Sequence, residues 1–90
     1  MKIKLRQYGE ILTSRPAGRE AALTMRAQLK PDKKEKIELD FEGVLSVGPS
    51  WLDEVLTFLK KEFGSKRIVC LPSSNASVIK SLEILENDSV

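Results

Sequence analysis

Four acidic side chains are the residues whose type and spacing best suit acid–base chemistry. Asp40 and Glu42 lie two positions apart, and Asp53 and Glu54 are adjacent. Two neighbouring carboxylates can act as a general acid and a general base. A structural explanation serves equally well, because the first two fall on the polar phase of a predicted strand. The other two suit the first turn of a predicted helix, where the dipole favours acids, so we predict no active site from these residues.

Histidine and cysteine, which often carry catalysis or bind metals, are nearly absent from the sequence. The chain has no histidine, the commonest general base and metal ligand. Its single cysteine, Cys70, lies in an apolar run and is expected to be a buried, reduced thiol with no base beside it. No glycine-rich phosphate-binding pattern occurs. The sequence therefore predicts no enzyme, no metal site and no cofactor.

The stretch 36–63 supplies the elements that would position the acidic residues. Apolar and acidic residues alternate over 37–42, which is typical of a strand with one apolar face. A Gly-Pro pair then turns the chain, and Ser50 three positions before Asp53 predicts a capping box at the start of a helix. Apolar residues at helical spacing give this helix one buried face: Leu52, Val55, Leu56, Leu59 and Phe63.

An earlier helix is predicted from about residue 15 to Leu29. Ser14 or Thr13 offers a capping hydroxyl, and Pro16 suits a position near the helix start. Small residues on the predicted inward face, with Gly18 first, would let this helix approach a sheet closely. The remaining members of that face are Ala22, Met25 and Leu29.

Arg15 and Arg19 occupy the first turns of this helix, where the dipole does not favour cations. The sequence leaves two interpretations open. Either both arginines are simply exposed, which costs little, or they contact a ligand or a partner protein.

The order of the remaining elements indicates the fold class. Short strands are expected over 2–6 at a sheet edge and at 11–12, a strand covered on both faces over 67–71, and a last helix with Val78, Ile79, Leu82 and Leu85 on one face. Strands that alternate with helices imply right-handed crossovers. We expect one α/β domain over 1–90: a small sandwich with a mainly parallel or mixed sheet of four to five strands and three helices. The N-terminal strand is the candidate antiparallel edge.

Composition narrows the class of partner. The net charge of +2 is too small to indicate nucleic acid, and the lysine-rich segment 30–36 is interrupted by Asp32 and Glu35, as in a solvated loop. No apolar run is long enough for a membrane span, and no secretory signal is seen at the N-terminus. A cytoplasmic protein without a membrane or nucleic-acid partner is expected. The nucleic-acid alternative would use Arg15, Arg19, Arg26 and the lysine loop.

The run LDFEGVLSVGPSWLDEVLTFL resembles the STAS-like domain family of bacteria, and LTSRPAGREAALTM resembles the segment before the first helix of that family. Together these runs cover about residues 11–63. The family is similar to STAS domains, the fold of anti-sigma-factor antagonists. The resemblance implies a non-enzymatic regulatory module that binds a kinase-like ATPase, of the histidine-kinase type. It also implies a switch by phosphorylation at a helix N-terminus.

Aligned through Leu52, the phosphorylated hydroxyl of STAS domains falls on Ser50. Gly48, Pro49 and Trp51 stand where the STAS motif has Asp, Ser and Gly. The acidic neighbour of the hydroxyl is therefore missing. Ser50 is either a phosphosite or a helix cap, and a cap contributes about 0.5–2 kcal/mol.

The predicted partner surface surrounds the start of helix 50–63. Its candidate residues are Arg15, Arg19, Trp51, Asp53, Glu54 and Phe58. Trp51 either stays partly exposed and anchors a partner or a twin subunit, or it packs at the edge of the core. A domain that binds a small ligand or nucleotide is the alternative from a different functional class.

Overall fold

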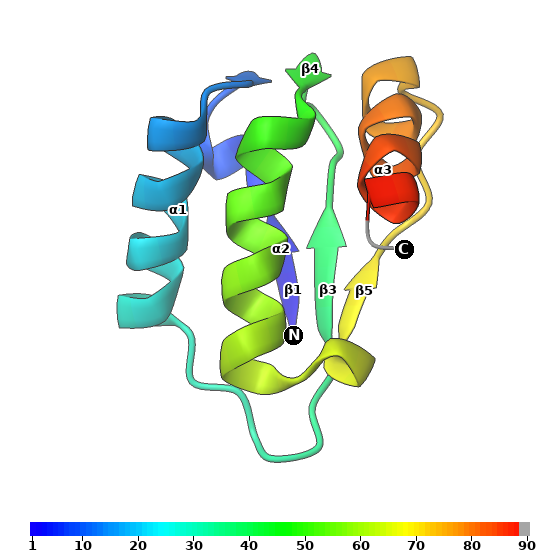
Figure 1. The fold of residues 1–90 in the computed structure, drawn as a ribbon. Helices are drawn as coiled ribbons and strands as arrows, with labels where there is room; N and C mark the ends of the chain where they lie inside the picture. Colours follow the sequence, from blue (N-terminus) through cyan, green and yellow to red (C-terminus); the bar gives the residue numbers. More distant parts are fainter. Residues whose placement is uncertain (89–90) are drawn as a thin grey trace.

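The computed structural model describes residues 1–88. The strands are β1 (Lys2–Lys4), β2 (Ile11–Leu12), β3 (Ile37–Asp40), β4 (Ser46–Val47) and β5 (Ile68–Cys70). The helices are α1 (Arg15–Gln28), α2 (Pro49–Phe63) and α3 (Ala76–Asp88), with short 3₁₀ turns η1 (Leu5–Tyr8) and η2 (Ser65–Arg67). Strands and helices alternate along the chain, as Figure 1 shows. The α/β prediction is confirmed.

The main sheet has the strand order β1-β3-β5, and both pairs are parallel. β3 is the central strand. Its alternating pattern places the side chains of Ile37 and Leu39 in the core, where they are fully buried. β1 lies at one edge, as predicted, but it pairs in parallel, so the antiparallel alternative for this strand is wrong. Right-handed crossovers through helices favour this parallel arrangement.

β5 lies at the other edge of this sheet, and its partial exposure corrects the prediction of a strand covered on both faces. All three of its residues are only half-buried. A continuous apolar run is compatible with a strand that has one covered face or two, so the sequence could not distinguish these cases.

A second, smaller parallel sheet joins β2 to β4 where the chain enters α1 and α2. The outer edge of β4 is closed by two serines of α3 that lie one turn apart. The N–H of Val47 donates to Ser77 Oγ (3.1 Å), and Ser81 Oγ donates to the carbonyl of Val47 (2.9 Å). Side chains of a helix thus take the place of a neighbouring strand, and they fix α3 beside β4.

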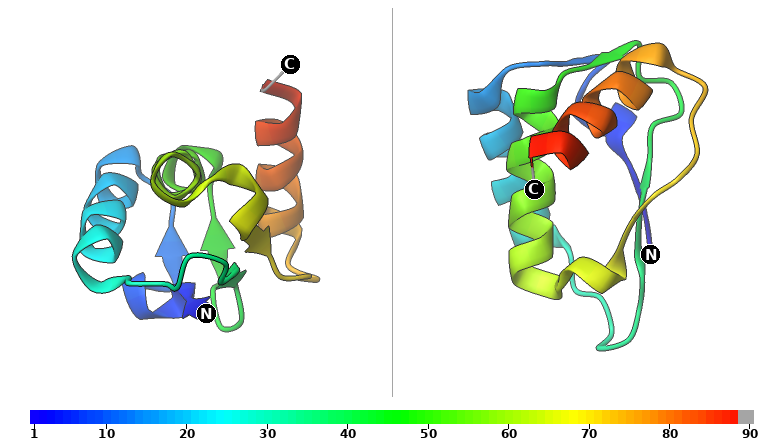
Figure 2. Two further views of the ribbon diagram at one scale, coloured as in Figure 1. Left: turned by 90° about the horizontal axis from the view of Figure 1, so that it is seen from below. Right: turned by 45° about the vertical axis from the view of Figure 1, so that its right-hand side comes forward.

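The helices α1 and α2 lie together on one side of the main sheet (Figure 2). α3 begins beside β4 and runs past α2. The opposite face of the sheet carries charged residues in register, with Lys2 beside Glu38 and Lys4 beside Asp40. The core between the sheet and the helices includes Ile3, Leu39, Met25, Leu52, Val55 and Leu59. Val78 of α3 also belongs to it, whereas Ile79 is exposed, contrary to the prediction for the last helix.

α1 begins and ends close to the predicted residues. Ser14 is its N-cap, and its Oγ accepts a hydrogen bond from the N–H of Ala17 (3.2 Å). Gly18 is buried, but the backbone it approaches belongs to α2, at Trp51, and not to the sheet. The prediction of a close approach at Gly18 is therefore correct, but the prediction that the sheet is its neighbour is wrong.

Candidate functional site

The three helices all begin at the end of the molecule where β2 and β4 lie, at the top of Figure 1. Ser50 is at this end, but it is not a helix cap. α2 begins at Pro49, with Gly48 as N-cap and no side-chain capping bond. Proline at the first helical position has the backbone angle of a helix already fixed. The helix therefore starts one residue earlier than predicted, and the capping box is wrong.

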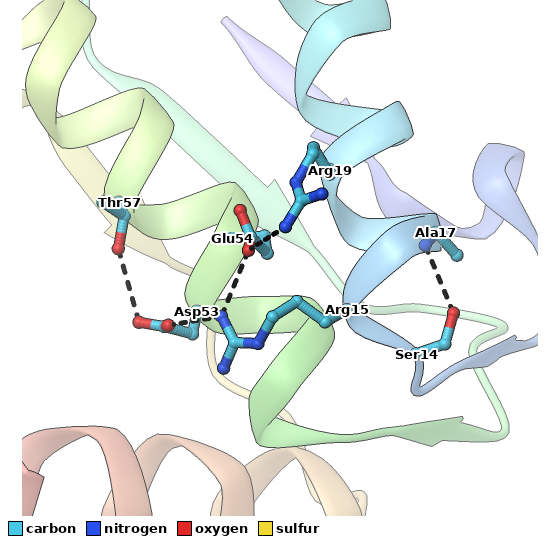
Figure 3. Close-up of polar contacts among 7 residues, drawn as sticks. All are labelled: Ser14, Arg15, Ala17, Arg19, Asp53, Glu54 and Thr57. Carbon is cyan, nitrogen blue, oxygen red and sulfur yellow. Dashed lines mark hydrogen bonds and ion pairs between the residues drawn. The ribbon is translucent and has the colours of Figure 1, made fainter.

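Arg15, Arg19, Asp53 and Glu54 meet between α1 and α2 (Figure 3). One guanidinium nitrogen of Arg15 lies 2.9 Å from Asp53 Oδ2 and 3.2 Å from Glu54 Oε1. Arg19 lies 3.5 Å from the same oxygen of Glu54. The hydrogen bond to Asp53, and then that to Glu54, raises the pKa of the Arg15 guanidinium. The two acids lie beyond the first turn of α2, and they bridge the helices.

This cluster explains the arginines that the helix dipole does not favour. All four side chains keep substantial contact with solvent. Exposed ion pairs contribute little to stability, and salt screens them. The cluster can therefore open at low energetic cost when another charged group competes for Arg15.

Trp51 is only 1% exposed and belongs to the core. The ring centroid of Tyr8 lies 6.4 Å from that of Trp51, at an interplanar angle of 52°. Phe58 is half-buried and packs against the same core. The interpretation of Trp51 as a partly exposed anchor is wrong, because the first turn of α2 faces α1 and the turn at Tyr8.

Two large apolar side chains are exposed at this end of the molecule. Ile11 in β2 is 69% exposed, and Leu45, directly before β4, is 65% exposed. The N–H of Leu45 donates to the carbonyl of Glu10 (2.9 Å), so the two segments are hydrogen-bonded neighbours. Sequence reasoning missed both residues, because strands of two residues are too short to show which phase faces the solvent.

Ser50 lines a cavity of about 460 Å³. The cavity lies between α2 and the second half of α3, and its lining includes Arg15, Asp53, Thr57, Lys60 and Leu85. Thr57 Oγ1 donates to Asp53 Oδ1 (3.3 Å), so one carboxylate faces both a hydroxyl and Arg15. The cavity combines an apolar wall with charges of both signs.

No cluster in residues 1–88 has the three or more acidic or sulfur side chains that a metal site needs. Cys70 is half-buried, and burial raises the pKa of its thiol. Within the same described residues, no helix has the length and apolarity for a membrane span.

Comparison with known families decides the classification. Residues 23–77, more than half of the chain, match the model of the STAS-like domain of unknown function (DUF4325). The chain belongs to this family. The match of the STAS-like domain runs from the middle of α1 to the start of α3, and it includes Ser50, Asp53 and Glu54 but not Arg15 or Arg19. Searches of curated proteins and of solved structures gave no match.

Proposed function

We propose that this STAS-like domain is a non-enzymatic regulatory module that binds a protein partner at the end where its helices begin. We call this region the helix-start surface and define it by Ile11, Arg15, Leu45, Ser50 and Asp53. The observation that carries the proposal is the exposure of Ile11 and Leu45 on neighbouring segments. Large apolar side chains grouped on a surface mark interaction sites.

The position of this surface in the fold supports the proposal. In α/β proteins with parallel strands, ligands and partners bind beyond the carboxyl ends of the strands. β2 and β4 end there and lead directly into α1 and α2. The apolar pair provides contact area, and the ion pairs beside it provide charges of both signs, as in the polar rim of an interface.

A kinase-like ATPase is the partner that we propose. The support is the family assignment together with the resemblance of 39–59 to the segment through which anti-sigma-factor antagonists are controlled. Arg15 and Arg19 are already paired with carboxylates, which disfavours a role in binding nucleic acid.

We further propose Ser50 as the phosphorylated residue of this surface. Ser50 is the second residue of α2, where backbone N–H groups and the helix dipole favour a phosphate. Asp53 and Glu54 would repel a phosphate, but both are paired with Arg15. A phosphate at Ser50 would compete for Arg15 and weaken its contact with Asp53.

The experiment is capture of partners from the native host, with the tagged domain and its Ile11→Glu and Leu45→Glu variants. A kinase-like ATPase should bind the wild type and be lost from both variants. Leu23→Glu is the matched control, because Leu23 is 58% exposed on α1, away from the helix-start surface. Capture that fails with wild type, or that survives both substitutions, contradicts the proposal. Intact-mass measurement of protein from the same host tests for a phosphate on Ser50.

A small anionic ligand is the second candidate function, favoured by Arg15 and Lys60 in the lining of the cavity beside Ser50. Thermal-shift measurements with nucleotides test it, since a ligand that binds only the folded state raises the melting temperature. A shift that Lys60→Ala abolishes supports the ligand, and the absence of any shift contradicts it.

A further inference from the structure

The outer edge of β5 has backbone groups that no strand uses. The N–H of Leu71 donates to the carbonyl of Leu39 (2.9 Å), and Leu39 is the register partner of Cys70. In a parallel pair, alternate residues direct their backbone groups to the neighbouring strand. The backbone N–H and carbonyl groups of Val69 and Leu71 therefore point toward β3, whereas those of Ile68 and Cys70 point away from the sheet.

Among the described residues 1–88, three of the four outward groups form no hydrogen bond. The N–H of Ile68 donates to the carbonyl of Ser65, at the end of η2. Within residues 1–88, no hydrogen bond joins the carbonyl of Ile68, or the N–H or carbonyl of Cys70, to another group. One residue of a parallel guest strand would pair with the carbonyl of Ile68 and the N–H of Cys70.

β5 lacks the charged side chains that protect the opposite edge of the sheet. The opposite edge strand, β1, carries the exposed residues Lys2 and Lys4, and edge lysines oppose pairing with other chains. β5 has the sequence Ile-Val-Cys, with neither charge nor proline. The edge is apolar and uncharged, as suits an added strand, and its length of three residues limits the pairing to a short segment.

A cavity of about 340 Å³, lined by apolar and charged residues, lies beside β5. Its wall contains Ile68 and Cys70 of β5, Leu56 of α2, and Leu82 and Leu85 of α3. The side chains of Ile68 and Cys70 thus line the cavity on the helix-covered face of the sheet. A side chain on the same face of an added strand would enter this cavity. Backbone pairing provides affinity in this binding mode, and the side-chain pocket provides specificity.

The charges around the edge are mostly positive. Lys60 lines the cavity and lies close enough to lower the pKa of the Cys70 thiol, although burial raises it more. Lys66 lies just before β5 and is exposed, whereas Arg67 donates hydrogen bonds to the backbone carbonyls of Asp32 and Glu35. Glu86 is the one acid in the cavity lining. Acidic residues on a guest strand would complement this set.

We propose that β5 binds an extended segment of a partner protein, apolar at its centre and acidic at both flanks, as a fourth strand of the main sheet. A second copy of β5 fits less well, because its flank would bring another Lys66, and not acidic residues, to this basic edge. This site is separate from Ile11 and Leu45 and does not depend on the helix-start surface.

The probe is the blocked peptide Glu-Asp-Ile-Val-Ile-Asp-Glu, titrated up to roughly millimolar concentration. The readout is alkylation of Cys70, the only thiol in the chain, at pH 9, where the reaction is fast enough to follow despite the raised pKa. At ten times the Kd, about one-tenth of the protein is free, so alkylation should slow about tenfold. The amide proton of Cys70 should show one of the largest NMR shifts.

Two control peptides separate the contribution of backbone pairing from that of the acidic flanks. Methylation of two consecutive central nitrogens removes donors on both edges of the peptide, and protection of Cys70 should disappear. Replacement of the four acids by lysine should weaken protection at least about fivefold. Lys60→Glu should weaken the preference for acidic flanks, because Lys66 remains, and Lys61→Glu, exposed one residue further along α2, should leave it unchanged.

Several results would overturn the proposal. One is the absence of protection and of NMR shifts at millimolar peptide. Another is equal protection by the methylated peptide, which would mean that the cavity takes a side chain without strand pairing. Slower alkylation at higher protein concentration, with no peptide, would make a second copy the occupant. Loss of kinase capture through Ile11→Glu would bear on the helix-start surface alone, so the two proposals fail independently.

Discussion

The carbonyl oxygen of Trp51 lies 2.6 Å from the position that a Cβ atom on Gly18 would occupy. The Cα atom of Trp51 would lie at 2.9 Å from the same Cβ. Both distances are too short for a carbon contact, and both atoms belong to backbone that cannot rotate away. The absence of a side chain at Gly18 thus sets how closely α1 approaches α2, and with it the ion pairs of Arg15 and Arg19.

Gly18→Leu should lower the free energy of unfolding by about 1–3 kcal/mol, because it overpacks this contact. Urea denaturation followed by circular dichroism measures the change. Ala17→Leu is the matched control, since Ala17 is exposed on the same turn, and it should differ from wild type by less than about 0.5 kcal/mol. Equal stability of Gly18→Leu and wild type would mean that α1 is not docked against Trp51.

Ser14 and Ser50 should respond differently to the same substitution. Ser14→Ala removes the cap of α1 and should cost about 0.5–2 kcal/mol. Ser50→Ala removes no capping bond and should change stability by less than about 0.5 kcal/mol. Thermal unfolding of the two variants side by side measures the contrast. A larger loss for Ser50→Ala than for Ser14→Ala would restore Ser50 as a cap.

Trp51 should behave as a core residue in solution. Its emission should be blue-shifted, resist quenching by acrylamide and stay constant with protein concentration, because the side chain is 1% exposed. Trp51→Ala should cost about 3–5 kcal/mol through the cavity that it leaves. Emission like that of free tryptophan, or a shift on dilution, would place Trp51 at the surface or in an interface.

Much of the fold was predictable because its strongest signals are local. The alternation over 37–41 places β3, and Ser14 with Pro16 marks the start of α1. The partial exposure of β5 was not predictable, since a continuous apolar run is compatible with one covered face or two. α2 begins one residue before the predicted start, because two local signals compete there. Pro49 favours the first helical position, and this preference outweighs the capping preference of Ser50.

The candidate site was predictable in part. The sequence places Arg15, Asp53 and Glu54 on one predicted partner surface, but their ion pairs join residues 38 and 39 positions apart, and no local pattern predicts such pairs. The exposure of Ile11 and Leu45 depends on which side of a two-residue strand faces the core. Trp51 was ambiguous for a related reason, because its neighbours Tyr8 and Gly18 lie on distant segments.

The affinity of the captured partner for purified variants tests the central claim most directly. Isothermal titration should show Leu45→Glu weakening the complex at least about tenfold, or about 1.4 kcal/mol, with Leu23→Glu unchanged and all variants folded. This result would place the partner on the helix-start surface. Equal affinity of wild type and Leu45→Glu, or equal weakening by Leu45→Glu and Leu23→Glu, would contradict the claim that this STAS-like domain binds its partner where its helices begin.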